Sequence, residues 1–422
     1  MLVIISCIIF VFGSMLLGIP LVAAFLGGSL VPLSLFGSIP LNVIPAKLFS
    51  SINVYSFLAV PFFMICGGLM DKGGIAKRLV DFAKSLVGWL PGSLAVCTFV
   101  ASAFFGAVSG SAVATIAAIG GIMLPLLLED GYPKPFALAT VTTAGFLGII
   151  IPPSIPMVLY GMTCGVSIAD LFSSGFVPGV LLTASMSAYA VLWGWKHPEV
   201  SRSKFSIRNV LVSLKGAIWA LLMPIIILGG IYSGLLTPTE SSAIAVVWAL
   251  IAGIFIYREI KPKDLYQIFI DSAKGSAMVL FIIATSTAFA WLFAYSGISA
   301  QLVNLVVGMN LTPTLFCLVT AIILLIFGTF LEGTAICVLL VPVLWPIAQA
   351  LGIHVIHFGM IVCVSNVVGT MTPPVAVNIF SAASVTKLKM GEISKGEIPF
   401  LIGYIAVFFA VVLFPQLSTF LL

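Results

Sequence analysis

The sequence predicts an all-α polytopic membrane protein built from two inverted repeats, with about ten transmembrane helices and two re-entrant helical hairpins. Three observations predict this class. The composition is strongly apolar, the charges are unevenly distributed along the chain, and an ordered series of motifs occurs twice.

Composition excludes a water-soluble protein. Of the 422 residues, 61% are hydrophobic and only 7% are charged, whereas soluble domains carry about 25% charged residues. So few charges could not cover the surface of a soluble globule, which excludes a soluble enzyme, a nucleic-acid binder and a disordered chain. The seven cysteines lie in apolar stretches without a CxxC pair, so we interpret them as core residues, and no organic cofactor is expected.

The basic residues divide the chain between the two sides of the membrane. The 18 Lys and Arg residues cluster mainly in 72–84, 196–215, 258–274 and 387–395, and none lies between 275 and 386. The positive-inside rule places these clusters in the cytoplasm and leaves 295–355 outside or within the membrane. The spans that fit between the charges are 1–17, 20–36, 51–70, 136–162, 171–195, 216–236, 239–257, 275–294, 356–384 and 398–420.

Two further apolar segments, 91–128 and 313–350, are too long for one span and carry Gly and Ser/Thr at their centres. The first segment is flanked by the basic stretch 72–84 and by Glu129, Asp130 and Lys134, so both of its ends lie on the same side of the membrane. We therefore expect each segment to form a re-entrant hairpin with its tip near the midplane, and the two hairpins to enter from opposite sides. The connecting arms 71–84 and 295–312 are predicted to be amphipathic surface helices.

The two halves repeat one another at a spacing of about 220 residues. The recurring pairs include FG at 105–106 and 327–328, GS at 110–111 with GT at 333–334, and GIIIPP at 148–153 with GTMTPP at 369–374. Each copy has five predicted crossings and one hairpin, and an odd number of crossings inverts the second copy. Inverted repeats with interrupted helices are typical of secondary transporters, with binding sites at the repeat interface.

The interrupted helices predict two related Na⁺ sites. Adjacent prolines remove two N–H donors inside an apolar span, and the freed carbonyls need partners in lipid. Hard cations take such oxygen ligands, and the few formal charges suit a monovalent ion. The first predicted site combines Ser109, Gly110, Ser111, Gly148, Ile151 and Pro153. The second combines Gly333, Thr334, Gly369, Thr372 and Pro374.

The alternative is that Gly and Pro only permit kinks and close helix packing, with Pro152 and Pro373 in a structural role. The repetition of each break beside a hairpin tip favours ion or substrate binding. Half-helix N-termini there would also suit a carboxylate. The residues predicted to line a substrate cavity are Ser154, Glu332, Asn366, Thr370 and Asn378.

Two acidic residues lie far from any basic residue in the sequence. Glu332, at the second tip, is expected to be a structural partner or a proton carrier. Glu240 has two open interpretations: a coupling residue, or an N-terminal helix position capped by Thr237 or Thr239.

Six segments, taken in order, resemble the large membrane subunit (DctM-like) of tripartite ATP-independent periplasmic (TRAP) transporters. They are PFFMICGGLMDKGGIAKRLVDFAKSLVG (61–88), FFGAVSGSAVATIAAIGGIMLP (104–125), GIIIPPSIPMVLYG (148–161), GLLTPTESSA (234–243), FGTFLEGTAICVLLVPVLWP (327–346) and GTMTPPVAVNIF (369–380).

This resemblance implies an ion-transporter-superfamily architecture, in which a transport domain moves against a scaffold as an elevator. It implies Na⁺-driven import of an organic acid, of the sialic acid or C4-dicarboxylate class, across the bacterial inner membrane. A periplasmic binding protein would deliver the substrate, and a small four-helix membrane subunit is expected as a separate chain. The predicted division is 1–90 (scaffold and arm), 91–195 (hairpin 1 and transport helices), 196–215 (cytoplasmic loop), 216–312 (scaffold and arm) and 313–422 (hairpin 2 and transport helices).

Other classes remain open at this stage. A stand-alone sodium/dicarboxylate symporter would share this chemistry but need no binding protein. A channel would not need inverted broken helices. A membrane enzyme is disfavoured by the three histidines in total and by the lack of a nucleophile–base constellation.

Overall fold

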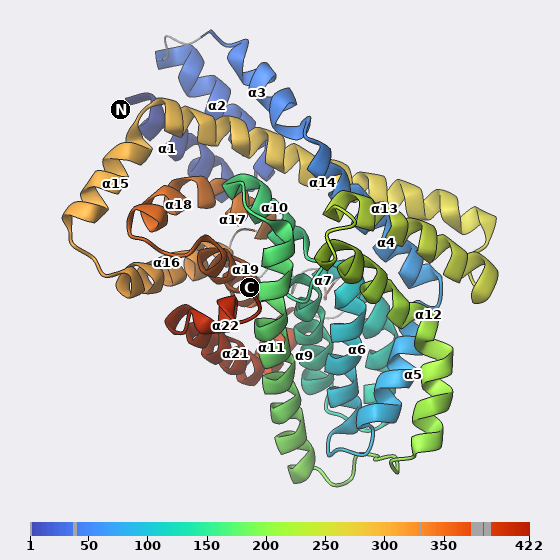
Figure 1. Ribbon diagram of the computed structural model, residues 1–422. Helices are drawn as coiled ribbons and strands as arrows, with labels where there is room; N and C mark the ends of the chain where they lie inside the picture. Colours follow the sequence, from blue (N-terminus) through green and yellow to red (C-terminus); the bar gives the residue numbers. More distant parts are fainter. Residues whose placement is uncertain (1, 37–39, 330, 332, 373–382, 384–389) are drawn as a thin grey trace.

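The computed structural model describes residues 2–36, 40–329, 331, 333–372, 383 and 390–422, and every regular element within them is helical (Figure 1). The first half contains α1 (Leu2–Leu16), α2 (Leu21–Phe36), α3 (Val43–Ile52), η1 (Tyr55–Leu58), α4 (Ala59–Lys72), α5 (Ile75–Val87), α6 (Ser93–Ser109), α7 (Ala112–Thr115), the π-helical η2 (Ile116–Gly120), α8 (Gly121–Glu129), α9 (Lys134–Gly145), η3 (Phe146–Ile149), α10 (Ile155–Cys164) and α11 (Ile168–Lys196). The second half contains α12 (Ile207–Tyr232), α13 (Pro238–Leu250), the π-helical η4 (Ile251–Ile256), α14 (Pro262–Tyr295), α15 (Ile298–Gly308), α16 (Pro313–Gly328), α17 (Gly333–Leu339), α18 (Val341–Ala350), α19 (Val355–Met371), α21 (Met390–Leu413) and α22 (Gln416–Thr419).

Among the described residues, six helical stretches are long and apolar enough to cross a membrane, and eight if each of two bent pairs is one span. Several further apolar helices have only 10–17 residues, among them α6, α10, α16 and α19. A full span takes about 20 residues. Of these short helices, α6 and α16 lie in the predicted hairpin segments 91–128 and 313–350, and α10 and α19 adjoin the predicted breaks.

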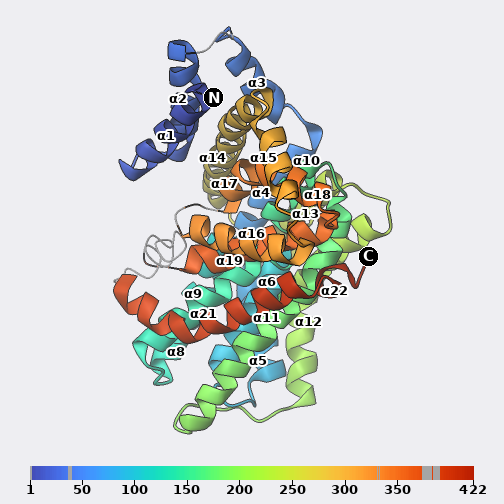
Figure 2. The ribbon, with the colours of Figure 1, turned by 90° about the vertical axis from the view of Figure 1, so that its left-hand side faces the viewer.

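The helices pack in two groups, which α6 of the first hairpin joins by packing against α4 and α5 as well as against α9 and α11. In one group, α4 packs against α13 and α14, and α5 packs against α12. In the other, α21 packs against α9, α11 and α19. Helix α14 contacts α2 and α3 on one side and α17 on the other, and Figure 2 shows it between the α1–α2 pair and the hairpin helices. The 34 residues of α14 therefore join the first group to the second hairpin.

In each hairpin, one glycine packs directly against a glycine of a broken helix. A Cβ added at Gly106 would lie 2.7 Å from the Cα of Gly148, and one at Gly328 would lie 2.7 Å from the Cα of Gly369. The partners within each contact come from equivalent positions of the two sequence repeats. Only small residues allow two helix backbones to approach this closely.

The arm helix α5 is amphipathic, as predicted. Ile75, Leu79 and Val80 are buried, whereas the basic and acidic side chains face outward. Arg78 fastens the arm to the α13–α14 connection. It donates to Glu259 Oε1 at 2.7 Å and lies 3.8 Å from the ring centroid of Tyr257.

Three predicted boundaries were wrong. The loop 196–215 is helical at its end, because α12 begins at Ile207, where the Ser206 hydroxyl accepts a hydrogen bond from Asn209 N. The span 275–294 begins earlier, at Pro262, because Asp264 caps this helix start. The span 51–70 is a pair of helices bent by 62°, since the backbone is non-helical at Asn53.

The glycine contacts generate a stability prediction. Gly106→Ala and Gly328→Ala should each destabilise the protein by about 1–3 kcal/mol, because the new methyl group meets backbone that cannot move aside. The measurement is the thermal midpoint with a thiol-reactive dye, which reports exposure of buried cysteines such as Cys97 and Cys363. Gly121→Ala is the matched control, because nothing lies within 4 Å of its Cβ position. Alanine at this helical position should be neutral or stabilising, and an equal loss in all three variants would contradict the packing argument.

Candidate functional site at the two hairpin tips

The first hairpin turns at a left-handed glycine. Helix α6 ends at Ser109, Gly110 has φ of 61°, and Ser111 caps the short helix α7 by accepting from Ala114 N at 3.4 Å. A Cβ at Gly110 would lie 2.9 Å from the carbonyl oxygen of Pro153. The tip therefore lies directly on the break between η3 and α10.

Hydroxyl and carbonyl oxygens converge at this tip. Thr115 Oγ1 lies 3.1 Å from Ser109 Oγ and donates to the carbonyl of Ser111 at 2.8 Å. Gly148 closes the group from the broken helix, because a Cβ there would lie 2.9 Å from the Ser111 carbonyl and would overlap Thr115 Oγ1. All these groups are oxygens, which are the ligands that hard monovalent and divalent cations prefer.

The second tip is built on Asn366 of α19. Its Nδ2 donates to the carbonyl of Gly333 at 3.4 Å, and its Oδ1 is buried without a hydrogen-bond partner. An unsatisfied buried acceptor is costly and calls for an explanation. One turn further along α19, Thr370 Oγ1 donates to the Asn366 carbonyl at 2.6 Å. The second tip thus presents a free amide oxygen beside the start of α17.

Both tips open into one small cavity of about 70 Å³. Gly110 and Ser111 line it from the first hairpin, Gly333 and Thr334 from the second, and Thr370 from α19. Met64 of α4 and Val279 of α14 line it as well. Two residues from each of the two predicted sodium sites therefore face a common space.

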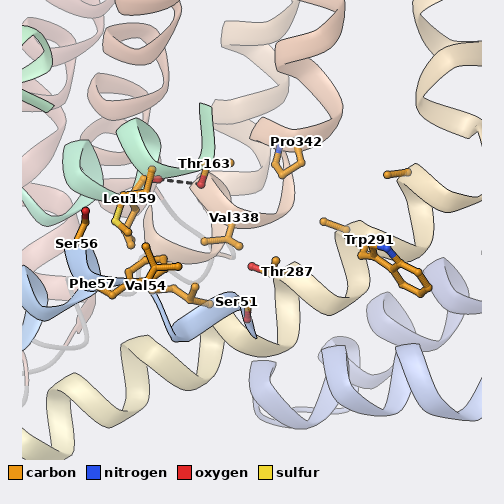
Figure 3. Close-up of a pocket in the computed structure, with 14 residues that line it drawn as sticks. Ser51, Val54, Ser56, Phe57, Leu159, Thr163, Thr287, Trp291, Val338 and Pro342 are labelled. Carbon is orange, nitrogen blue, oxygen red and sulfur yellow. Dashed lines mark hydrogen bonds between the residues drawn. The ribbon is translucent and has the colours of Figure 1, made fainter. Parts of the chain in front are cut away.

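A larger cavity of about 580 Å³ lies one helical turn away (Figure 3). We call it the vestibule. The small cavity is lined by Ile155, Val279 and Thr334, and the vestibule by the residues four positions later on the same three helices: Leu159 of α10, Ile283 of α14 and Val338 of α17. Ser51, Val54, Ser56 and Phe57 close its other side, as Figure 3 shows. No charged residue is among the described residues that line either cavity.

The position of the vestibule relative to the membrane follows from the charges on α14. The last basic residue of α14 is Lys274, and the vestibule residues of this helix run from Ile283 to Ala294, which lies 20 positions after Lys274. At 1.5 Å per residue this is about 30 Å, the thickness of the hydrocarbon core. With the basic end in the cytoplasm, the vestibule opens toward the opposite side.

Other predicted residues lie near the tips without lining the small cavity. Ile151 and Pro152 pack against Gly179 and Gly175 of α11, and Ser154 Oγ donates to the Ile149 carbonyl at 2.6 Å. Thr372 Oγ1 donates to the Val368 carbonyl at 2.8 Å. These residues contact or form the breaks without facing the small cavity.

Glu240 is a helix cap. Its carboxylate accepts from Thr237 N at 2.8 Å while Thr237 Oγ1 accepts from Glu240 N. This capping box begins α13, away from both cavities. The remaining predicted residues, Glu332, Pro373, Pro374 and Asn378, lie outside the described residues.

Three site residues were missed by the sequence reasoning. Thr115 lies in the same SGSAVAT stretch as Ser109 and Ser111, four positions after Ser111, and helical spacing could have identified it. Met64 and Val279 belong to apolar helices with no polar signal, so only the packing reveals them.

The first tip generates a prediction with a close control. Gly110→Ala and Gly165→Ala both place a side chain in the left-handed region, at φ of 61° and 67°, which costs about 1–2 kcal/mol. Only the Gly110 variant also meets the Pro153 carbonyl, whereas nothing lies within 4 Å at Gly165. Thermal unfolding should therefore show a loss larger by about 1–3 kcal/mol for Gly110→Ala. Equal losses would mean that the tip does not rest on the break.

Known proteins match the chain over nearly its whole length. Residues 7–417 match the family described as "Tripartite ATP-independent periplasmic transporter, DctM component". The chain is 39% identical to the C4-dicarboxylate TRAP transporter large permease protein DctM of Pseudomonas aeruginosa, over 93% of this chain and 92% of that protein. It is 31% identical to the 2,3-diketo-L-gulonate TRAP transporter large permease protein YiaN of Escherichia coli, over 96% and 95%.

A third relative, the isethionate TRAP transporter permease protein DctMQ of Oleidesulfovibrio alaskensis, is 35% identical over 96% of this chain and 64% of its own length. Among solved structures, the YdaH transporter of Alcanivorax borkumensis has the same fold, with a TM-score of 0.62 at 15% identity, over 96% of this chain and 97% of that one. The all-α transporter fold predicted from the sequence is thereby confirmed. The chain belongs to the DctM family, the large permease component of TRAP transporters, and is a transporter subunit rather than an enzyme.

Proposed function

We propose that this chain is the large permease subunit of a sodium-driven TRAP transporter that imports an organic acid across the bacterial inner membrane by an elevator mechanism. A periplasmic binding protein delivers the acid, and a small membrane subunit pairs with this chain. The observation that carries the proposal is that both hairpin tips share one cavity, and that the vestibule is lined by residues one turn further along the same three helices.

The donor set at the tips fits sodium. Ser109, Thr115 and the carbonyls of Ser111 and Pro153 offer only neutral oxygens at the first tip. The unpartnered Asn366 Oδ1 offers another at the second. The described residues contain no group of His, Cys, Asp or Glu that could hold a metal ion, and neutral oxygens suit a monovalent ion. Bound sodium would supply positive charge beside the cavity, where it favours a carboxylate.

The relatives support an organic acid as substrate. Their names specify C4-dicarboxylates, 2,3-diketo-L-gulonate and isethionate. This range of acids favours a dicarboxylate or sugar acid here and leaves a sialic acid as a second class to be tested. The relative named DctMQ is longer, and the match covers 64% of its length. Its name and its extra length support a second membrane component.

The two packing groups suggest which helices form the two parts of the elevator. The α4–α5–α12–α13–α14 group would be the scaffold, and the hairpins with α9, α10, α11, α19 and α21 would move as a unit. The glycine contacts hold each hairpin to its broken helix, so substrate and ions would travel with both tips. Each net positive charge that moves inward gains about 2.3 kcal/mol per 100 mV.

Reconstituted uptake tests the function. Purified permease is placed in proteoliposomes with its small subunit, and uptake of labelled succinate and of a labelled sialic acid is measured with and without a Na⁺ gradient and the binding protein. Uptake that needs both sodium and the binding protein is expected. Full-rate uptake without the binding protein would instead establish the stand-alone symporter, and uptake without sodium would refute the sodium sites.

A matched pair of variants tests the first tip. Thr115→Val removes the hydroxyl that joins Ser109 and Ser111, and should raise the Na⁺ concentration for half-maximal uptake about five-fold or more, the loss of one hydrogen-bonding ligand of about 1 kcal/mol. Thr183→Val is the control. Its hydroxyl makes the same bond one turn back, to Gly179 O at 2.8 Å, on α11 outside the cavity. Unchanged sodium dependence in Thr115→Val would remove this residue from the site.

A further inference from the structure

Lys47 is an exception to the charge distribution. The other described Lys and Arg residues belong to the basic clusters or are Lys134, and the topology predicted from the sequence places them on the cytoplasmic side. Lys47 lies on α3, the first helix of the bent pair that ends at Lys72, so it stands at the opposite end of that pair from the cytoplasmic Lys72. It therefore sits on the extracytoplasmic side, where the positive-inside rule disfavours a basic residue and a specific reason for its presence is needed.

Lys47 stands at the rim of the vestibule. Its Nζ lies 5.3 Å from the ring centroid of Trp291, and Trp291 lines the vestibule from α14. Ser51, one helical turn after Lys47 on α3, lines the vestibule as well. Figure 3 shows Ser51 and Trp291 on the two elements that flank this end of the cavity. The aromatic face holds the ammonium in place without neutralising its charge.

Among the residues that the structure describes, no acidic side chain forms an ion pair with Lys47. The ion pairs described in the structure join Lys72 to Asp71, Arg78 to Glu259 and Lys274 to Asp271. The vestibule lining contains no Asp or Glu among its described residues. A single positive charge thus borders an otherwise uncharged, mainly apolar cavity of about 580 Å³, where low-dielectric walls extend its field.

We propose that Lys47 is an electrostatic capture residue, which draws the carboxylate of the substrate to the outer mouth of the vestibule. This inference rests on the proposed function, because it takes the vestibule as the entry route of an organic acid. Lys47 acts before binding: it raises the local concentration of anions at Trp291 and leaves the small cavity between the tips unchanged. The alternative is an interfacial anchor, a Lys–Trp pair that only positions α3 at the membrane surface.

Fluorescence quenching tests the local field without any transport. The full-length protein is placed in phosphatidylcholine nanodiscs, and Trp291 emission is isolated as the difference from Trp291→Phe, since the chain has seven tryptophans. Iodide and neutral acrylamide are the two quenchers. A unit charge about 5 Å away enriches a monovalent anion about two- to four-fold in water before salt screening.

The ratio of iodide to acrylamide quenching at Trp291 should therefore fall about two- to four-fold in Lys47→Gln. It should be retained in Lys47→Arg and in Lys77→Gln, a lysine of the arm α5. High salt should lower the wild-type ratio toward that of Lys47→Gln. A ratio unchanged in Lys47→Gln would overturn the proposal in favour of the anchor.

Uptake then tests whether this field serves the substrate. In the reconstituted system, Lys47→Gln should lower kcat/KM for the loaded binding protein about two- to four-fold with kcat retained, and Lys47→Arg should restore it. The affinity of the loaded binding protein for the permease should not change. A parallel loss of that affinity would show that Lys47 contacts the binding protein, which would also overturn the proposal. If the wild-type protein imports no organic acid, the proposed function fails. The quenching ratio at Trp291 would still show whether Lys47 raises the local concentration of anions.

Discussion

The absence of water in the bilayer core is the constraint on which this structure depends. A helix broken at mid-membrane exposes backbone groups that lipid cannot satisfy. The helix formed by α9 and η3 breaks between Ile149 and Ile155. The tip of the first hairpin packs against this break, so that Gly110 meets the carbonyl of Pro153. Close approach at Gly106 and Gly148 makes this arrangement possible. The polar groups that result supply oxygen ligands within a mainly apolar region.

The same arrangement explains why the described residues that line the site carry no charge. An ionised side chain at the membrane centre is costly, whereas hydroxyl and carbonyl oxygens are already present wherever a helix starts, ends or breaks. Ser109, Ser111 and Thr115 all lie at one such junction, and Asn366 faces another. A cation held by these groups would bring the positive charge that attracts a carboxylate, so selectivity for the acid would depend on sodium being bound first.

Much of the fold could be predicted because its signals are local or repeated. Hydrophobic length gives the helices, basic clusters give the sidedness, and GIIIPP with GTMTPP gives the breaks. Helix ends such as Ile207 and Pro262 were missed because caps extend helices beyond the apolar stretch that the spans were drawn on. The union of both tips in one cavity, and the parts played by Met64 and Val279, depend on packing between residues about 220 positions apart. No local pattern encodes such a contact.

The long helix α14 touches α2 and α3 on one flank and α17 on the other, and this placement has a mechanical consequence. If the hairpins move, α17 must slide along α14, and the side chains at this helix contact determine how easily it moves. Val279 and Ile283 of α14 and Thr334 and Val338 of α17 line the two cavities at this contact. The rate of travel would then depend on the same helix surfaces that enclose the substrate route.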